Sequence, residues 1–189
     1  MIQTTIAEPT PEELEAVLSR PDAQYEIVDG EIVEKPDVSM RAQWIALGFF
    51  RRIDEFIRAN RLGWAGHELK FLLDPARPLS RQPDVSFVSY ERWPAGKRWA
   101  NEGDWPVVPD LAIEILSLHD RGGKTSKKVR EYFRYGVKQV WLIQPETCEV
   151  SIYTAPKRVQ ILDEEDTLDG GDVLPGFRLA VADLFKDEE

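Results

Sequence analysis

Hydrophobic and polar residues follow two different periods along this chain, and each period predicts a class of secondary structure. Between residues 40 and 60 the apolar residues recur every three or four positions, as on one face of an α-helix. The same spacing predicts a second helix over residues 125–135, with Val129 and Tyr132 facing inward. Short apolar runs of the kind that form buried strands occupy residues 64–73, 83–88, 110–117 and 137–143.

Turn residues divide the two ends of the chain into further elements. Asp29-Gly30 lies between two alternating runs and predicts a two-residue β-hairpin over residues 25–34. Thr10-Pro11 and the glutamates that follow have the pattern of a helix start. The tail predicts two strands and a short helix, at residues 149–153, 158–163 and 181–185.

Two polar segments are predicted as loops, over residues 74–82 and 91–109. The resulting order of helices and strands predicts a mixed α/β (α+β) fold with a central sheet, an N-terminal hairpin and a strand-rich tail. The chain has 189 residues and no recognisable interdomain linker, so we expect a single domain over residues 1–189.

Composition narrows the class of protein. Cys148 is the one cysteine, which together with the lack of a secretory signal pattern leads us to expect a cytoplasmic location. No apolar run approaches the roughly 20 residues of a membrane span, so we expect no membrane association. The net charge of −10 argues against a broad nucleic-acid-binding surface, although a carboxylate-rich metal site remains compatible with it.

The residues with the clearest chemical meaning are two acids and a lysine. Glu114 lies within the buried run 110–117, where an isolated carboxylate would cost several kcal/mol or more, so a metal ion or a lysine should compensate its charge. Asp84 begins another buried run, and Lys128 lies on the helix that follows Glu114. Carboxylates on neighbouring strands can bind Mg²⁺, or Mn²⁺ in its place, and a lysine can orient water or stabilise phosphate charge.

Each of these residues also has an ordinary structural interpretation. Asp84 can simply begin a strand after Pro83, Glu114 can form a buried ion pair with an arginine, and Lys128 can be a solvated helix residue. The occurrence of all three in this order favours a metal-dependent phosphodiesterase site.

Several segments together resemble the Uma-two family of restriction-endonuclease-like proteins, which belongs to the PD-(D/E)XK nuclease superfold. They are YEIVDGEIVE, PDVSFV, DLAIEILS, KVREYFRYGVKQVWLI and LPGF, within residues 25–185. The resemblance implies a mixed sheet flanked by helices and Mg²⁺ ligands on two central strands. It assigns Asp84 to the PD motif and Glu114 to the second acid, and it implies an endonuclease. We expect its partner to be nucleic acid, with DNA preferred and RNA left open.

The sequence departs from the superfold pattern at the lysine. Leu116, and not a lysine, lies two residues after Glu114. The family has a lysine on the following helix, four residues before the position of Tyr132, so the resemblance assigns the role to Lys128. Lys124, one helical turn earlier, is the alternative. We assign no role to His119, in the loop between Glu114 and the helix.

Further acids can complete a metal site. Glu68 is predicted on the strand next to Asp84 and is expected as a third metal ligand, with a solvent-facing strand position as the alternative. His67 should point to the opposite face of that strand. Glu26, on the first hairpin, is either an outer ligand or one member of an ion pair within the sheet.

Basic residues interleaved with tryptophans lie on both sides of the Asp84 run. They can hold a nucleic-acid backbone and stack bases, or form a charged loop with tryptophans packed into the core. These residues are Arg77, Arg81, Arg92, Lys97 and Arg98, with Trp93, Trp99 and Trp105.

The leading hypothesis is therefore a Mg²⁺-dependent endonuclease in which Asp84, Glu114 and Lys128 are catalytic and Asp84, Glu114 and Glu68 bind metal. One alternative is a catalytically degenerate module of the same fold that binds nucleic acid or protein. Another is metal-dependent hydrolysis of a small phosphodiester or other substrate, which the acidic composition would suit better. Apolar residues in the tail, together with the habit of related folds, lead us to expect a homodimer or a higher homo-oligomer.

Overall fold

The structure, a computed structural model, describes residues 25–28, 31–34, 39–76, 79–99, 103–117 and 122–186. The helix predicted to start at Thr10 lies outside these residues, as do His119 and the Asp29-Gly30 turn. The backbone of Lys124 is described, whereas its side chain is not.

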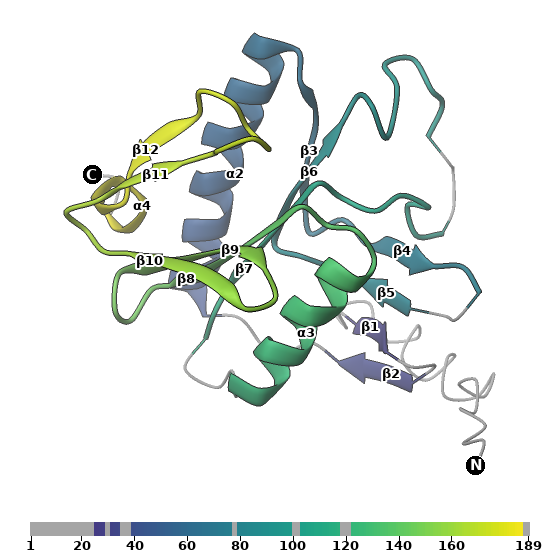
Figure 1. The fold of residues 1–189 in the computed structure, drawn as a ribbon, viewed down its shortest axis with the longest axis horizontal. Coiled ribbons are helices and arrows are strands. Elements are labelled where there is room, and N and C mark those ends of the chain that lie inside the picture. The colour runs from purple at the N-terminus through teal and green to yellow at the C-terminus, as the bar shows by residue number, and fades with distance from the viewer. Residues whose placement is uncertain are drawn as a thin grey trace.

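A six-stranded mixed sheet forms the centre of the fold (Figure 1). Its strands occur in the order β10-β9-β8-β7-β6-β3, where β7 and β8 are parallel and the other neighbours are antiparallel. The strands are β3 (Gly63–His67), β6 (Val85–Ser89), β7 (Leu111–Ile115), β8 (Gln139–Gln144), β9 (Glu149–Ala155) and β10 (Arg158–Leu162). Strands β6, β7 and β8 are buried along nearly their whole length, which explains their continuous apolar sequences.

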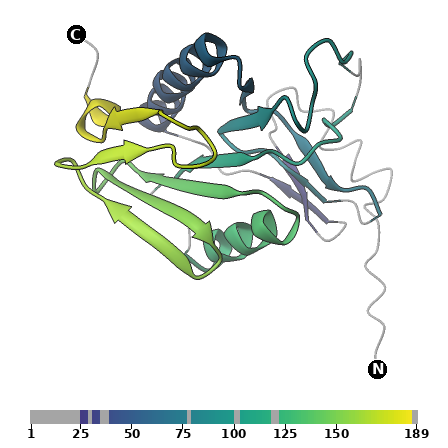
Figure 2. The ribbon, with the colours of Figure 1, turned by 45° about the horizontal axis from the view of Figure 1, so that its top comes forward.

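Two helices cover opposite faces of this sheet, α2 (Met40–Asn60) and α3 (Gly122–Arg134), as Figure 2 shows. The Ser39 hydroxyl caps α2 by accepting from the Ala42 N–H at 3.2 Å, and Arg61 ends the helix in the left-handed region with φ of 53°. Helix α3 connects the parallel strands β7 and β8. Both helices agree with the predicted ones, and none of the described helices has the length and hydrophobicity to cross a membrane.

The core is divided between the two faces of the sheet. Alternate side chains of β7 point to opposite sides, so Ile113 packs in the cluster with Phe49 and Ile53 of α2, while Ala112 packs in the cluster with Val129 and Tyr132 of α3. Glu114 shares the α3 side with Ala112, and this alternation places its carboxylate under α3.

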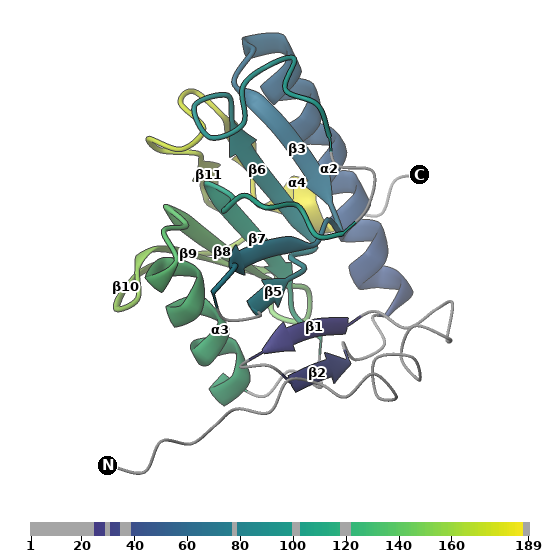
Figure 3. The same ribbon diagram turned by 90° about the vertical axis from the view of Figure 1, so that its right-hand side faces the viewer.

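A second, four-stranded sheet lies beside the first, with the order β2-β1-β5-β4 (Figure 3). Its strands are β1 (Tyr25–Val28), β2 (Glu31–Glu34), β4 (Phe71–Asp74) and β5 (Leu79–Arg81). The antiparallel pairing of β1 and β2, with Val28 opposite Glu31, confirms the predicted hairpin. Ile27 pairs with Ser80, which joins the hairpin to β5.

The single strand predicted over residues 64–73 is wrong, because the chain changes sheet within it. Strand β3 belongs to the six-stranded sheet and β4 to the four-stranded one. Glu68 lies between them with φ of 50°, a left-handed conformation that interrupts the strand. The loop predicted over residues 74–82 likewise contains the short strand β5.

The tail is strand-rich, as predicted, and returns to the side of α2 (Figure 2). Beyond the predicted strands β9 and β10, it forms a small ribbon of β11 (Thr167–Asp169) and β12 (Arg178–Ala180), followed by α4 (Ala182–Phe185). Leu168, Leu174 and Phe177 are buried in the same core cluster as the inward face of α2. Strands of three residues carry too little pattern to be predicted.

Candidate active site

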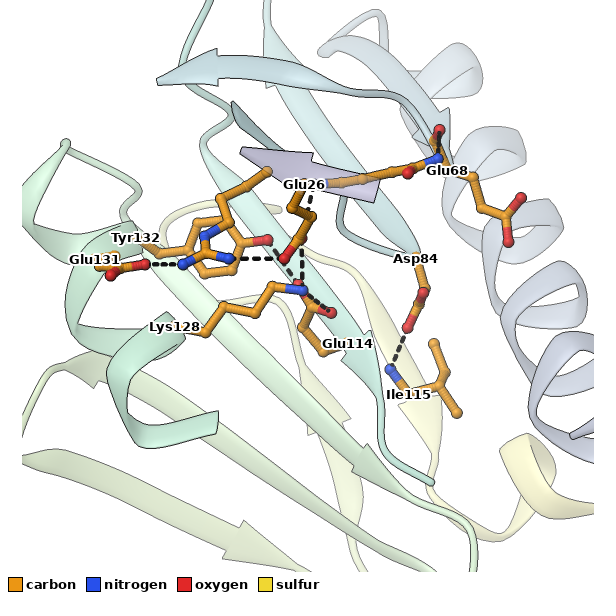
Figure 4. A network of polar contacts seen from close by, with 10 residues as sticks. Glu26, Glu68, Asp84, Glu114, Ile115, Lys128, Glu131 and Tyr132 are labelled. Atoms are coloured by element: carbon orange, nitrogen blue, oxygen red, sulfur yellow. Dashed lines mark hydrogen bonds and ion pairs between the residues drawn. The ribbon is translucent and has the colours of Figure 1, made fainter. Parts of the chain in front are cut away.

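Glu114 lies on the α3 side of β7 and is paired with a lysine. Its Oε2 atom is 2.8 Å from the Lys128 Nζ, and its Oε1 atom accepts a hydrogen bond of 2.6 Å from the Tyr132 hydroxyl (Figure 4). Lys128 and Tyr132 are four residues apart on α3, so their side chains leave the same face of the helix. A lysine thus provides the charge compensation that the sequence led us to expect for Glu114.

Asp84 lies one residue before β6, at the level of Glu114 on the neighbouring strand. The antiparallel register pairs Val85 with Ile113, and its continuation by one residue brings Asp84 opposite Glu114. The Asp84 Oδ2 accepts from the Ile115 N–H at 2.7 Å. The register therefore brings Asp84 and Glu114 to the same end of β6 and β7, with both acids buried, and Lys128 contacts Glu114 there.

Glu68 is close to this site through its backbone and not through its carboxylate. Its N–H donates to the Asp84 carbonyl at 3.0 Å, but the side chain points away from Glu114 and Lys128 (Figure 4). The positive φ of Glu68 breaks the alternation of the strand that would have turned this side chain toward the site. The preceding His67 packs on the Phe50 ring of α2, and within the described residues no group of three or more histidine, cysteine, aspartate or glutamate side chains is arranged to hold a metal ion.

Glu26 reaches the same lysine from the other sheet. Its Oε1 lies 2.9 Å from the Lys128 Nζ and accepts from the Gln82 N–H at 3.0 Å, and its Oε2 lies 2.7 Å from the Arg81 Nη1. This confirms the ion-pair interpretation of Glu26. Arg81 also pairs with Glu131 of α3 and is only 5% exposed, so it is a buried structural cation and is not available to a nucleic-acid backbone.

The charges in this network reinforce one another. Burial raises the pKa of Glu26, but Lys128, Arg81 and the Gln82 N–H outweigh it and hold this pKa at about 2. Burial lowers the pKa of Lys128, whereas Glu114 and Glu26 raise it more strongly. Burial and the two nearby glutamates raise the pKa of Tyr132 well above its usual value. At neutral pH, Glu26 is therefore ionised, Lys128 is a cation and Tyr132 is a neutral hydrogen-bond donor.

The tryptophans of segment 91–109 form a packed aromatic cluster. Trp93 and Trp105 are buried and contact each other edge to face at 5.4 Å, whereas Trp99 is 48% exposed. Arg92 donates to the carbonyls of Val108 and Gly136, at the opposite end of β7 from Glu114. The packing interpretation is therefore the correct one for Trp93, Trp105 and Arg92.

Sequence reasoning missed part of the network. It placed Tyr132 inward as an apolar residue and overlooked its hydroxyl, and it assigned no role to Glu131. One signal was present, because a buried tyrosine usually needs a hydrogen-bond partner and Tyr132 is one helical turn from Lys128. The Arg81 pairs had no comparable signal.

The described chain forms a mixed sheet between two helices, which is the architecture that the family resemblance implied. Residues 11–182 match the sequence profile of the Uma2 family, described as "Putative restriction endonuclease". The chain therefore belongs to the Uma2 family, as its sequence motifs predicted.

The fold is also similar to a crystal structure described as that of "a putative nuclease belonging to DUF820" from Anabaena variabilis ATCC 29413. The two chains are 23% identical and superpose with a TM-score of 0.77, over 91% of this chain and 96% of the other. This similarity confirms the predicted fold class. A search of curated proteins gives no match.

Proposed function

We propose that this protein is a Mg²⁺-dependent endonuclease that hydrolyses phosphodiester bonds in nucleic acid, with DNA as the expected substrate. The observation that carries the proposal is the 2.8 Å contact between the Lys128 Nζ and the Glu114 Oε2. Lys128 supplies from α3 the cation that the superfold usually places two residues after the second acid. Membership of the Uma2 family supports the same reaction class.

The donor chemistry of Asp84 and Glu114 fits a hard divalent cation. Mg²⁺ commonly takes one or two carboxylates from the protein, with water and substrate phosphate oxygens as its other ligands. Each carboxylate oxygen can accept more than one contact, so the bonds from Lys128, Tyr132 and the Ile115 N–H are compatible with such a role. Mg²⁺, or Mn²⁺ in its place, would supply charge neutralisation and a more acidic water. A third ligand from Glu68 stays a prediction.

The residues of the chain would divide the remaining work. Asp84 lies just before β6 and Glu114 lies on the adjacent strand β7, so these buried strands would hold the two carboxylates at a set separation. Lys128 stays charged and presents a donor to the attacking water or to the phosphate oxygens, where negative charge develops. Tyr132 fixes the orientation of the Glu114 carboxylate through its 2.6 Å hydrogen bond.

The test is cleavage of a panel of single- and double-stranded DNA and RNA in the presence of Mg²⁺, Mn²⁺ or a chelator. We expect cleavage that requires the cation and that is lost in Glu114→Ala. Activity that survives this substitution, in protein shown by circular dichroism to be folded, would contradict the assignment.

A second candidate is a module of this fold that binds nucleic acid or protein without cleaving it. The observation in its favour is the extent to which protein donors already occupy the acids, because both oxygens of Glu114 and of Glu26 accept from side chains or backbone. Calorimetric titration with Mg²⁺ and Mn²⁺ separates the two candidates. Heat of binding that disappears in Asp84→Ala favours the nuclease, and DNA binding without any cation binding favours the module.

The expected homo-oligomer and the cytoplasmic location stay predictions. Analytical ultracentrifugation of the full chain tests the first of them. The chain mass is 21.7 kDa, and a homodimer would give a molar mass of about twice this value. Fluorescence microscopy of a tagged chain tests the second.

A further inference from the structure

The ammonium group of Lys128 lies between two carboxylates that come from different sheets. Glu114 on β7 is 2.8 Å away and Glu26 on β1 is 2.9 Å away (Figure 4). Glu114 has a place in the proposed chemistry as a metal ligand. Glu26 has none, although it is one of the most buried acids of the described chain, at 5% exposure.

Glu26 is held rigidly by its own neighbours. The Arg81 guanidinium and the Gln82 N–H together fix both of its oxygens. A carboxylate held at both oxygens cannot follow a moving partner. It therefore acts as a fixed anchor for the flexible side chain of Lys128.

We propose, on the basis of the proposed function, that Glu26 is a positioning residue that holds the Lys128 ammonium at the Glu114 carboxylate during the reaction. A lysine side chain carries considerable rotamer entropy, and a single ion pair restrains it poorly. If Glu114 shares its charge with a bound cation, its attraction for Lys128 weakens. Glu26 keeps its own contact with Lys128 throughout, because no part of the proposed metal site involves Glu26.

A double-mutant cycle tests this idea, with Glu26→Gln and Lys128→Met made singly and together. Glutamine preserves the size of Glu26 and removes its charge. We expect Glu26→Gln to lower kcat by about 10- to 100-fold with KM changed by less than about threefold, as for other residues that orient a catalytic group. In the Lys128→Met background, the same substitution should lower kcat by less than about threefold, since there is no ammonium left to position.

The matched control is Glu131→Gln. This residue holds Arg81 from the other side, and its ion pairs are with Arg81 and Lys127 and not with Lys128. We expect its kcat to stay within about threefold of wild type, because the two contacts of Lys128 are preserved. An equal fall of kcat in Glu26→Gln and Glu131→Gln would assign the effect to general loosening of the network and overturn the proposal.

Two further measurements separate the remaining explanations. Calorimetry should give a Mg²⁺ affinity for Glu26→Gln within about threefold of wild type, whereas a loss of tenfold or more would make Glu26 a metal ligand and overturn the positioning role. If Glu26→Gln does not fold, Glu26→Asp keeps the charge and withdraws it by one methylene. It should then lower kcat by less than Lys128→Met does, and an unchanged kcat would also overturn the proposal.

The outcomes distinguish this inference from the proposed function. If the wild-type protein neither binds Mg²⁺ nor cleaves nucleic acid, both the proposed function and the positioning role of Glu26 are wrong. If wild type is active and Lys128→Met is impaired, the double-mutant cycle decides the role of Glu26. Effects of Glu26→Gln and Lys128→Met on kcat that multiply fully would contradict the positioning role of Glu26 and leave the proposed function intact.

Discussion

Two buried acids stand near opposite ends of strand β7, and their surroundings differ. Asp110, just before the strand, is paired with two cations, with its Oδ1 at 2.9 Å from the Lys138 Nζ and at 3.0 Å from the Arg92 Nε. Glu114, near the other end, is paired with Lys128, which it shares with a second acid, Glu26. Asp110 thus has two cations of its own, whereas Glu114 shares its one lysine with Glu26, which is also paired with Arg81.

The difference distinguishes an acid whose ion pairs join segments of the chain from the acid that the proposed function uses. Burial raises the pKa of Asp110, but Lys138, Ser89 and Arg92 lower it more, and the Lys138 side chain remains 48% exposed. Arg92 also binds carbonyls of the neighbouring loops, so this end of β7 ties segments of chain together. A buried charge with its counter-charge is therefore weak evidence of catalysis by itself. Under the proposed function, Glu114 would instead take part in binding a divalent cation.

The largest expected effect compares the two acids directly. Glu114→Gln should lower the rate of Mg²⁺-dependent cleavage by about 1000-fold or more, because a proposed metal ligand loses its charge. Asp110→Asn, assayed below its melting temperature, should cleave at a rate within about threefold of wild type. The partners of Asp110 lie at the other end of the strand from Glu114. The measurement is the initial rate of cleavage by each variant, with circular dichroism to show that each variant is folded. Equal losses of cleavage rate in Glu114→Gln and Asp110→Asn would contradict the proposed difference between the two acids.

The next effect concerns the pH dependence of stability. Glu26 has its pKa lowered from 4.5 to about 2, so it stabilises the folded state fully above pH 4.5 and loses this contribution as the pH falls toward 2. The contribution amounts to about 3 kcal/mol. Urea unfolding at several pH values should show a shallower acid loss of the free energy of unfolding in Glu26→Gln. The control Asp110→Asn should keep the Glu26 contribution to the acid loss of the free energy of unfolding. If Glu26→Gln lost stability with falling pH as steeply as wild type does, Glu26 would not be the source of this contribution.

A third test moves the lysine. Lys128→Met should lower the cleavage rate by about 100-fold, because the cation that stabilises developing charge is lost. Adding Leu116→Lys restores the spacing of the superfold, on the same side of the strand as Glu114, and should recover at least about tenfold. The matched variant Lys138→Met, which removes the lysine of Asp110, should leave the rate within about twofold. Failure of Lys128→Met to slow cleavage would remove Lys128 from the mechanism.

The smallest effect concerns the neutral donor to Glu114. Tyr132→Phe removes the hydroxyl that donates to the Glu114 Oε1 and should cost about 1–2 kcal/mol of stability. It should also slow cleavage by about tenfold, since the carboxylate becomes free to rotate. Tyr90→Phe keeps the ring against Trp64 and is a control for which we expect an unchanged rate. A faster enzyme after Tyr132→Phe would show that the hydrogen bond restrains Glu114 unproductively.

The parts of the site that could be predicted from the sequence arise from local patterns. The apolar run around Glu114 predicted its burial, and the period of the following helix placed Tyr132 inward, one turn after Lys128. Both belong to the contiguous β7–α3–β8 unit, in which the 3.6-residue and two-residue periods decide which side chains face each other. Asp84 was recognised at the start of another buried run, and the family resemblance then assigned it to the PD motif. The register of β6 against β7 brings it level with Glu114.

The parts that could not be predicted depend on contacts between distant segments. Glu68 adopts a positive φ without the glycine that usually signals it, so no local pattern indicated that its strand would end there. The partner of Glu26 had to be selected among 24 lysines and arginines. Only the pairing of β1 with β5, at Ile27 and Ser80, brings Glu26 next to Arg81. Pattern reasoning has no access to such a choice.

The position of Lys128 between the two sheets has a further consequence, for the linkage between ligand binding and folding. Its partner Glu26 belongs to the four-stranded sheet and Glu114 to the six-stranded one, so this side chain joins the two halves of the protein. Any ligand that binds only the joined arrangement stabilises it by mass action. We expect Mg²⁺ and nucleic acid to slow amide hydrogen exchange in β1, which lies far along the sequence from Asp84 and Glu114. Unaltered exchange in β1 would show that the two sheets are uncoupled.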